Sequence, residues 1–382
     1  MSIATELTLL ANSKQAIKNS INAKGGSITD STPFADYSTA IDNLPSGGDD
    51  STLRDLIERD ITSITIPSGT TRISDYTFYY CRNLTSVTIP SGVTEIGLSA
   101  FSNCQSLASV SIPNTVTIIQ GSAFETCGLT SVSLPNISWI KNRTFYQCAS
   151  LTSVNIPNTV TTIDNAAFYG CISMKSFTIP SSVTSLNGGT FQQCNHLESL
   201  VFLGTTPPTL DRYSTPFGQT NDCPIYVPSA SVAAYKAADR WSLVESRIYA
   251  IAQVATVDNT PVYNYDLGMT STTMITSTNM QKMPTGTSLE LAEGIVDAGG
   301  SFGNYTSITL PSTFSSFDDQ GMIGNTTTTL TCLATTPPTA ERNNLGGANL
   351  TAIYVPAANV ADYQANATWS SFSSIIQAIP SE

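Results

Sequence analysis

The sequence predicts a mainly β fold built as a solenoid of short stacked units. A phenylalanine recurs at steps of 23, 23, 21, 23 and 23 residues, and a cysteine follows each one three positions later. A fixed period of about 20–50 residues is typical of solenoids. The phenylalanines are Phe78, Phe101, Phe124, Phe145, Phe168 and Phe191, and the cysteines are Cys81, Cys104, Cys127, Cys148, Cys171 and Cys194.

Each unit contains a short strand that ends at a proline. In LTSVTIP (84–90), Leu84, Val87 and Ile89 are the apolar residues among serine and threonine, as in a half-buried strand. Proline has no N–H donor, so the strand ends there. One unit is too short to bury its own apolar side chains, and we therefore expect stability to come from stacking against neighbouring units.

These blocks resemble the BspA-like leucine-rich repeat family. The resemblance is carried by LTSVTIP, VTEIG and AFSNC within residues 84–104 and by their copies across residues 60–203. It implies a leucine-rich-repeat solenoid, to which the flanking segments add a helical N-terminal module and α/β terminal caps. The family is found in bacterial and protist surface proteins and in phage-encoded proteins, so the resemblance predicts the fold better than the function.

The cysteines are expected to be buried thiols. Six of the eight occupy one register of the repeat, where stacked side chains would run parallel about one strand spacing apart, a poor geometry for a disulfide. No Cys-X-X-Cys pair is present. A metal site or a disulfide is the alternative interpretation, and we predict no metal and no cofactor.

Residues 1–45 are expected to form a helical anchoring module. The apolar residues of the first helix fall at steps of 4, 3, 7 and 4, namely Ile3, Leu7, Leu10, Ile17 and Ile21. A second helix is expected from Thr32–Pro33, with Phe34 and Tyr37 on its apolar face. A hairpin closing on itself, the start of a dimeric or trimeric coiled coil, and a dock onto a larger assembly all fit this pattern.

Residues 14–44 are similar to a short N-terminal module of tailed-phage structural proteins. The shared pattern is K-x-x-I-x-x-x-I-x-x-K-G followed by D-x-T-P-F-x-x-Y. The matching residues are Lys14, Ile17, Ile21, Lys24, Gly25, Pro33, Phe34 and Tyr37. This resemblance implies attachment to a phage particle, with Ile3, Leu7, Leu10, Ile17, Ile21, Phe34 and Tyr37 as the docking residues.

The rest of the chain divides around a repeated ending. The segments LGTTPPTL (203–210) and IYVPSASVAAYKAADRW (225–241) return as LATTPPTA (333–340) and IYVPAANVADYQANATW (353–369), and each predicts a strand followed by a helix. We therefore expect a linker and N-terminal cap at 46–59, the solenoid at 60–203, a cap at 204–252, a degenerate second repeat or β domain at 253–332 and a second cap at 333–382.

The second domain has one recognisable unit. NYTSITLPSTFSSF (304–317) aligns with NLTSVTIP, with Phe302 at the cysteine position and Met322 at the phenylalanine position. Upstream, residues 254–291 alternate weakly and show no register. We expect either a short solenoid or a sandwich-like β domain.

Composition limits the partners and the compartment. The net charge of −12 argues against non-specific binding to nucleic acid or to an anionic membrane surface. No apolar run has membrane length, and MSIATELTLLANSK lacks the basic and apolar regions of a signal peptide. We expect synthesis in a host cytoplasm and a virion location, without membrane insertion.

The sequence offers no catalytic constellation, so we predict that the protein is not an enzyme. The only histidine, His196, stands where other units have serine or asparagine, which favours an exposed polar residue. Without a second histidine, a serine or cysteine triad has no credible base. No phosphate-binding or dinucleotide-binding glycine motif is present.

Candidate binding residues come from columns of equivalent positions. The position after the phenylalanine varies and tolerates polar residues, so it is expected to face outward: Tyr79, Ser102, Glu125, Tyr146, Tyr169 and Gln192. Tyr79, Tyr146 and Tyr169, with Tyr80 beside them, can form an aromatic ridge, and Trp139 stands in a column of polar residues. The alternative is that these aromatic residues only cover adjacent units.

The strands also carry columns of serine and threonine, which suit glycan contact or simply a solvated β face. We predict a virion structural or attachment protein of a tailed phage. Its N-terminus would bind other virion proteins, and its repeats would bind a host surface protein, a glycan or a virion protein, with homo-oligomerisation compatible. The alternative is a bacterial leucine-rich-repeat adhesin or protein-binding scaffold.

Overall fold

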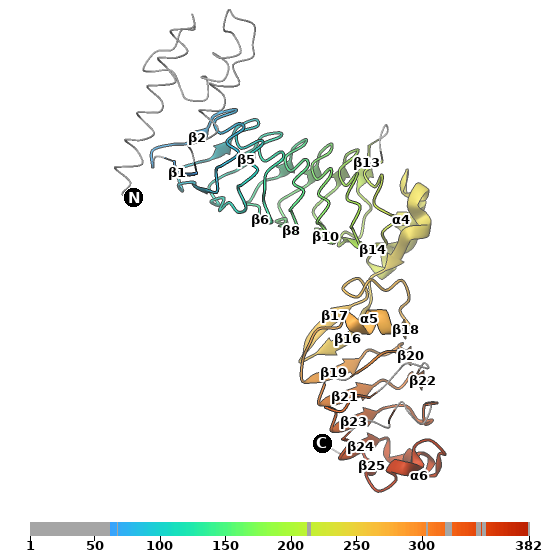
Figure 1. The fold of residues 1–382 in the computed structure, drawn as a ribbon. Helices are drawn as coiled ribbons and strands as arrows, with labels where there is room; N and C mark the ends of the chain where they lie inside the picture. The colour runs from blue at the N-terminus through green and yellow to red at the C-terminus, as the bar shows by residue number, and fades with distance from the viewer. Residues whose placement is uncertain are drawn as a thin grey trace, which may run out of the picture. The chain divides into compact units, whose positions relative to one another are not determined.

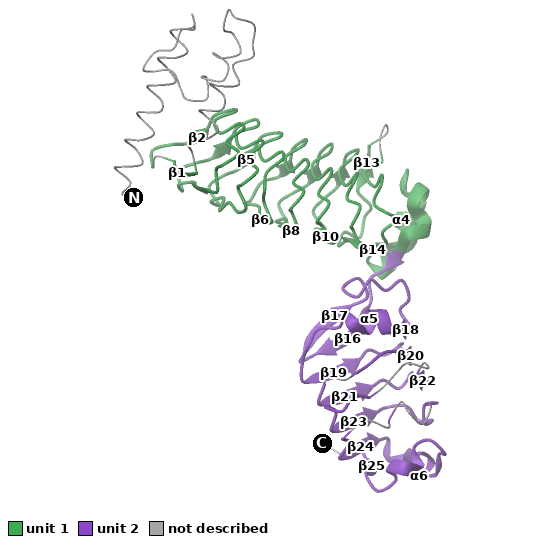
Figure 2. Cartoon of the chain, viewed as in Figure 1, with its two compact units in different colours: residues 1–248 green, residues 249–382 purple. Residues whose placement is uncertain are grey.

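The computed structural model describes residues 62–66, 68–211, 215–302, 305–317, 323–340, 345 and 349–380. The chain forms two compact units, unit 1 (1–248) and unit 2 (249–382), shown in Figure 2. The expected helical module (1–45), the linker and cap (46–59) and Met322 lie outside the described residues.

Unit 1 is a solenoid in which each sequence unit forms one turn, here called a rung, with a longer and a shorter strand (Figure 1). The longer strands are β1 (Ser63–Thr65), β3 (Ser86–Thr88), β6 (Ser131–Ser133), β8 (Ser153–Asn155), β10 (Ser176–Ile179) and β12 (Ser199–Phe202). The shorter strands are β2 (Arg72–Ile73), β4 (Glu95–Ile96), β5 (Ile118–Ile119), β7 (Trp139–Ile140), β9 (Thr162–Ile163), β11 (Ser185–Leu186) and β13 (Thr209–Leu210).

Successive rungs pair in parallel and in repeat register. Ser63 lies opposite Ser86, and Val132 lies opposite Val154. The expected strand in 107–113 is reduced to a single bridge between Ser111 and Thr88. The predicted mainly β solenoid is confirmed.

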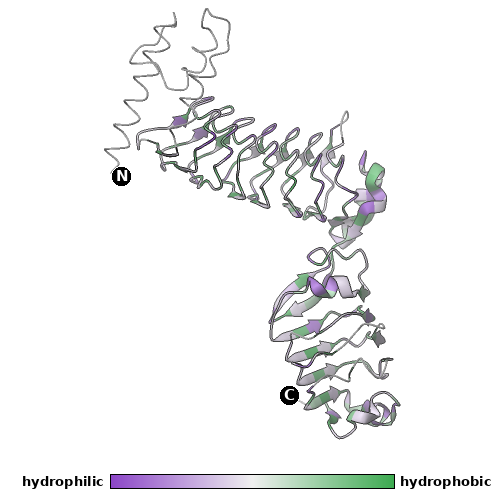
Figure 3. Cartoon of the chain, viewed as in Figure 1, coloured by the Kyte–Doolittle hydropathy of each residue, from purple (hydrophilic) through white to green (hydrophobic). Residues whose placement is uncertain are grey.

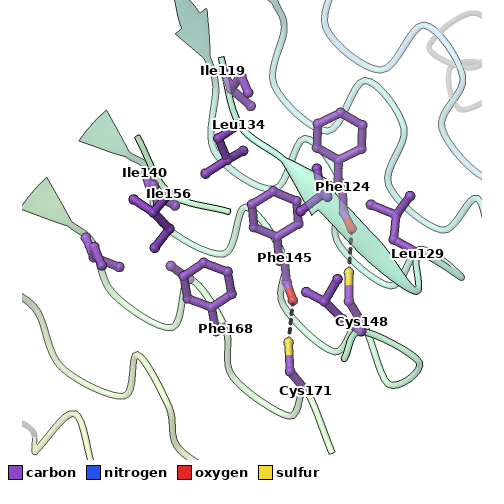
Figure 4. Close-up of a cluster of buried hydrophobic side chains, with 14 of the residues drawn as sticks. Ile119, Phe124, Leu129, Leu134, Ile140, Phe145, Cys148, Ile156, Phe168 and Cys171 are labelled. Atoms are coloured by element: carbon purple, nitrogen blue, oxygen red, sulfur yellow. Dashed lines mark hydrogen bonds between the residues drawn. The ribbon is translucent and has the colours of Figure 1, made fainter. Parts of the chain in front are cut away.

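The phenylalanines form a continuous ring column in the core. Their centroids lie 5.1–6.0 Å apart from one rung to the next, and the rings of Phe101 to Phe191 are within 8° of parallel. Figure 4 shows the rings of Phe124, Phe145 and Phe168 in this column. Offset stacking of this kind contributes about 0.5–1.5 kcal/mol per ring pair beyond the area that it buries.

The cysteines form a second ladder beside the rings. Each thiol from Cys104 to Cys194 donates a hydrogen bond to the phenylalanine carbonyl of the preceding rung, over 3.0–3.3 Å; for example, Cys148 donates to Phe124. All eight cysteines are buried and free of disulfides, which confirms the prediction of buried thiols. A thiol suits this position because it is small and apolar yet can donate to a buried carbonyl.

Each rung turns through two residues with a left-handed backbone. The first position holds Tyr76, Ser99, Ser122, Arg143, Ala166 and Gly189, and the second holds Tyr80, Asn103, Thr126, Gln147, Gly170 and Gln193. The N–H groups of Ser122, Phe124 and Thr126 donate to carbonyl oxygens of the next rung at 3.0, 3.0 and 2.7 Å. These bonds hold a conformation that costs a non-glycine residue about 1–2 kcal/mol.

Unit 1 ends in a cap made of short elements. They are β14 (Ile225–Val227), η1 (Ser229–Ser231), α4 (Val232–Ala237), η2 (Trp241–Arg247) and β15 (Ile248–Ala250). Tyr235 and Trp241 are fully buried. The Tyr235 hydroxyl donates to the Gly204 carbonyl at 2.9 Å, and the Trp241 indole N–H donates to the Pro208 carbonyl at 2.8 Å. These bonds attach the cap to the chain that leaves the last rung.

Unit 2 begins with an antiparallel hairpin of β16 (Gln253–Val257) and β17 (Thr260–Tyr263). Its turn residues, Asp258 and Asn259, have φ of 46° and 64°, as a tight hairpin turn requires. The antiparallel partner of β16 on its other edge is β19 (Ser288–Leu291). This hairpin explains why no repeat register is visible in the sequence of residues 254–291.

Parallel strands then continue as a short solenoid. The longer strands after β19 are β21 (Ser307–Leu310), β23 (Thr329–Cys332), β24 (Ala352–Val355) and β25 (Ile376–Ala378); the shorter ones are β18 (Met274–Ile275), β20 (Asp297–Ala298) and β22 (Ser316–Phe317). Helix α5 (Ser277–Gln281) follows β18. Figure 3 shows hydrophobic and hydrophilic residues interspersed along these strands. Ile308 and Leu310 of β21 are buried in the core of unit 2.

The cap of unit 2 is built like that of unit 1. It contains η3 (Ala357–Asn359), α6 (Val360–Ala365) and η4 (Ser370–Phe372). The buried Tyr363 hydroxyl donates to the Ala334 carbonyl at 2.8 Å, and the buried Trp369 indole donates to the Pro338 carbonyl at 3.0 Å. The shared sequence therefore produces the same two hydrogen bonds in both units.

Candidate functional site

The outward side chains of the shorter strands of unit 1 form one surface, the short-strand face. In chain order they are Arg72, Glu95, Ile118, Trp139, Thr162, Ser185 and Thr209. The strand register places Glu95 beside Ile118 and Trp139 beside Thr162. Trp139 is 46% exposed and Ile118 is 41% exposed, so two large apolar side chains interrupt a polar column.

The exposed part of Trp139 could be buried by a binding partner, and this burial would stabilise the complex. Burial of an aromatic side chain removes about 150–250 Å² from water, so roughly 100 Å² of the indole remains accessible. At about 25 cal/mol per Å², a partner that covered this area would gain roughly 2–3 kcal/mol. Trp139 is therefore the side chain of the short-strand face that can contribute most binding energy.

A chain of polar side chains runs across four rungs next to Trp139. Arg72 Nε lies 3.3 Å from a Glu95 carboxylate oxygen, and Gln120 donates to the other oxygen at 2.7 Å. The hydrogen bond from Gln120, together with Arg72, lowers the pKa of Glu95. Lys141 donates to the Gln120 side-chain oxygen at 2.5 Å, and its ammonium group lies 5.7 Å from the centroid of the Trp139 ring. These side chains hold one another in place, and Lys141 is the one that reaches the indole.

A second aromatic group lies on the turn side of the rungs. The Tyr146 and Tyr169 rings stack with centroids 4.7 Å apart and planes 12° from parallel. The Arg143 guanidinium lies 4.0 Å from the Tyr146 centroid and forms an ion pair with Glu125 at 2.6 Å. Both tyrosines are half-buried by these contacts, so much of their surface is used within unit 1.

A third group gathers on the first rung. The Tyr79 and Tyr80 ring centroids are 4.5 Å apart, and Tyr76 meets Tyr79 edge-on at 5.6 Å. Arg82 lies over the Tyr80 ring at 5.0 Å. Tyr79 and Tyr80 are half-buried, whereas Tyr76 is exposed.

The predicted tyrosines do not form one continuous ridge. Ser102 and Glu125 occupy the two rungs between Tyr79 and Tyr146. Ser102 is only 2% exposed, which corrects the expectation that this whole column faces outward. The neighbouring Asn103 side chain donates to its hydroxyl at 3.0 Å, so a small polar residue can turn inward there. Trp139 belongs to a different column, the short-strand face.

The comparisons with known proteins identify the repeat. A profile described as the BspA type leucine-rich repeat region matches six copies, over residues 57–127 and 117–207. Residues 57–207 are BspA-type leucine-rich repeats. No curated protein sequence matches the chain.

Several solved structures are similar to this chain. A T. pallidum leucine-rich repeat protein is 31% identical, covering 39% of this chain and 73% of that chain, with a TM-score of 0.37. A Bacteroides ovatus leucine-rich repeat protein is 19% identical, with coverages of 84% and 67% and a TM-score of 0.37. A leucine-rich cell surface protein of Faecalibacterium prausnitzii is 19% identical, with coverages of 84% and 79% and a TM-score of 0.37.

The longer strands of the BspA-type repeats present the predicted hydroxyl columns. The outward residues of β3, β6 and β8 are exposed: Ser86, Thr88, Ser131, Ser133, Ser153 and Asn155. Adjacent threonines are already engaged, since Thr85 and Thr152 donate to carbonyls of the preceding rung at 2.8 and 2.9 Å. The exposed column is therefore the part of this face open to a ligand.

Among the described residues, no group of three or more His, Cys, Asp or Glu side chains could hold a metal ion. Burial raises the pKa of Cys148 and of Cys194 to about 12, so these thiols stay protonated near neutral pH. His196 is exposed on the last rung. No helix in the described part of the chain is long and apolar enough to cross a membrane.

Unit 2 contains a surface cavity of about 290 Å³ beside the hairpin turn, lined by residues that include Asp258, Asp266 and Lys282. The Asp258 carboxylate accepts hydrogen bonds from Ser288 N–H at 2.8 Å and from the Thr287 hydroxyl at 2.8 Å. These bonds lower the pKa of Asp258 to about 2. Asp258 therefore holds the turn against β19, which is a structural role.

The expected docking residues Ile3, Leu7, Leu10, Ile17, Ile21, Phe34 and Tyr37 lie outside the described residues. Three residues around Trp139 were not identified from the sequence: Ile118, Gln120 and Lys141. Ile118 could have been found, because it stands one unit before Trp139 in the same column. Gln120 and Lys141 carry no such signal, since their role depends on side chains from neighbouring rungs.

Proposed function

We propose that the chain is a non-enzymatic attachment protein of a tailed-phage particle. In this proposal the N-terminal residues dock to the particle, and the BspA-type repeats bind a partner on the host surface or on another virion protein. The observation that carries the binding role is the exposure of Trp139 and Ile118 in a column that is otherwise polar.

Two arguments support a binding role for this face. Exposed aromatic side chains, tryptophan above all, are enriched at the centre of recognition surfaces. Ile140 fills the core side of β7, so the fold does not need the outward Trp139 side chain for its core. The exposed part of the Trp139 side chain is thus available to a binding partner.

The particle location is supported by the N-terminal sequence. The pattern that includes Lys14, Gly25 and Pro33 is similar to an N-terminal module of tailed-phage structural proteins. Such a module would leave the repeats free to project a binding face.

Deletion of residues 1–45 tests the particle location. The truncated chain should keep the thermal unfolding of its repeats but fail to co-purify with phage particles when it is supplied to an infection that lacks the full-length protein. The matched control is full-length Trp139→Ser, which should be incorporated normally. Normal incorporation of the truncated chain would contradict the proposal and favour the alternative of a bacterial adhesin or protein-binding scaffold.

A further inference from the structure

We propose that Trp139 is the platform of a binding site for a neutral sugar ring. The inference rests on the proposed function, in which the repeats bind a partner, and it specifies the chemical class of that partner. The site comprises the indole of Trp139, with Ile118, Gln120, Lys141 and Thr162 around it.

The position of the Trp139 indole suits a sugar platform. The chain has three tryptophans, and two of them, Trp241 and Trp369, are fully buried and hydrogen-bonded in the caps. Trp139 alone is exposed, at 46%. It lies on a parallel sheet of two-residue strands, so it offers an accessible aromatic surface of the kind on which the C–H face of a pyranose ring stacks.

Polar side chains surround the Trp139 indole. Along the short-strand face the next outward residues are Thr162 and Ser185, whose hydroxyls both donate and accept. Gln120 lies on the preceding rung, and Lys141, on the same rung as Trp139, reaches the ring itself. Adjacent rungs are about 4.7–4.9 Å apart, comparable with the width of a sugar ring, so the ring hydroxyls can reach polar groups on both sides.

The charges near Trp139 and on the whole chain favour a neutral ligand. Arg72 is engaged by Asp75 at 2.7 Å and by Glu95 at 3.3 Å, and Gln120 links Glu95 to Lys141. The Glu95 carboxylate is thus engaged by Arg72 and Gln120, and the Lys141 ammonium donates to the Gln120 side-chain oxygen. The chain as a whole carries a net charge of −12, which repels anionic glycans. A neutral sugar fits both facts.

The size of the apolar patch argues against a protein as the occupant. A stable protein interface covers about 800 Å² on each partner around an apolar core. The short-strand face provides two large apolar side chains, Ile118 and Trp139, set among serine, threonine and charged residues. One aromatic platform with a polar rim is enough for a sugar ring.

Sugar binding can be measured through the fluorescence of the exposed Trp139 indole. The full-length chain is titrated with neutral homo-oligosaccharides of glucose, galactose, mannose and N-acetylglucosamine, and with a uronic-acid oligosaccharide, while tryptophan emission is recorded. Trp241 and Trp369 are buried, so a ligand-dependent change reports Trp139. We expect at least one neutral oligosaccharide to bind, Trp139→Ala to weaken it about tenfold or more, and Ile172→Ala, at an exposed residue outside the short-strand face, to leave its affinity unchanged.

Trp139→Ala removes a side chain that lies outside the core, so the variant should unfold at the same temperature as the wild type. An unchanged unfolding temperature shows that a loss of sugar affinity is not a loss of folding. Unchanged sugar affinity in Trp139→Ala, or tighter binding of the uronic-acid oligosaccharide, would overturn the inference. So would host-cell binding by the wild type without binding of any neutral oligosaccharide, a result that leaves the proposed function standing. Failure of the full-length chain to bind host cells or virion proteins at all would instead contradict the proposed function.

Discussion

The stacked phenylalanine rings of unit 1 let us predict how much Phe145→Ala lowers the free energy of unfolding. Phe145 is fully buried, and its ring stacks on Phe124 at 5.7 Å and on Phe168 at 5.5 Å, nearly parallel to both. Its carbonyl also accepts the Cys171 thiol of the next rung at 3.3 Å. The substitution therefore opens a cavity in the middle of a column whose neighbouring rungs are tied together by hydrogen bonds and cannot easily collapse.

The magnitude follows from these contacts. A buried phenylalanine changed to alanine costs about 3–5 kcal/mol, depending on how far the site can collapse. Two ring contacts of about 0.5–1.5 kcal/mol each are lost together, so we expect the upper part of that range, about 4–5 kcal/mol. Phe78→Ala is the matched control, because Phe78 stands at the end of the described column, is 6% exposed and loses the one ring contact with Phe101. Its cost should be about 3 kcal/mol.

Urea unfolding followed by far-UV circular dichroism and by tryptophan emission measures both variants against the wild type. The free energy of unfolding of unit 1 should fall in the order wild type, Phe78→Ala, Phe145→Ala. A cost below about 1 kcal/mol for Phe145→Ala, or an equal cost for the two variants, would refute the argument that the stacked column is a main contributor to stability.

Two further predictions concern single residues. Thr126 has φ of 55°, an unfavourable backbone for a β-branched residue, so Thr126→Gly should leave the melting temperature unchanged or raise it. The control Thr88→Gly, on the exposed face of β3, should instead lower the free energy of unfolding by about 0.5–1 kcal/mol. Equal losses of stability in the two variants would contradict this prediction. Hydrogen bonds from Ser288 and Thr287 lower the pKa of Asp258 to about 2 from an ordinary value of 3.8. Because the folded pKa is the lower one, the stabilisation is present above the unfolded pKa and is lost as the pH falls towards 2. Asp258→Asn should therefore make the acid unfolding of unit 2 less dependent on pH between about pH 4 and pH 2, and an unchanged pH profile would contradict this role.

Much of unit 1 could be predicted because its core repeats in the sequence. A strict period of apolar residues leaves one consistent way of burying them, which is stacking, so the columns of Phe124 and Cys148 follow from spacing alone. The start of unit 2 could not be predicted in the same way. Its hairpin repeats nothing, and the next step, from Ser288 to Ser307, is 19 residues, shorter than the period of unit 1.

The candidate site was predictable only in part. Trp139 stood out because it breaks a polar column. The sequence does not show, however, which side chains of neighbouring rungs form hydrogen bonds with one another. The bond from Lys141 to Gln120 joins residues 21 positions apart, and both side chains are long enough to take many other conformations. The same limit applies to Ser102, which turns inward although Tyr79 and Tyr146, its equivalents, are half-exposed.

The sequence by itself determined the solenoid, its period, the buried phenylalanine and cysteine columns and the repeated cap, because each depends on local pattern repeated many times. Tertiary structure alone decided the left-handed turns, since Tyr80, Asn103, Thr126 and Gln147 share no residue type and are held there by N–H bonds to the next rung. It also decided that Trp139 stands on an accessible face beside a hydrogen-bonded polar chain. Contacts between rungs are set by stacking geometry, and no single unit of the sequence encodes them.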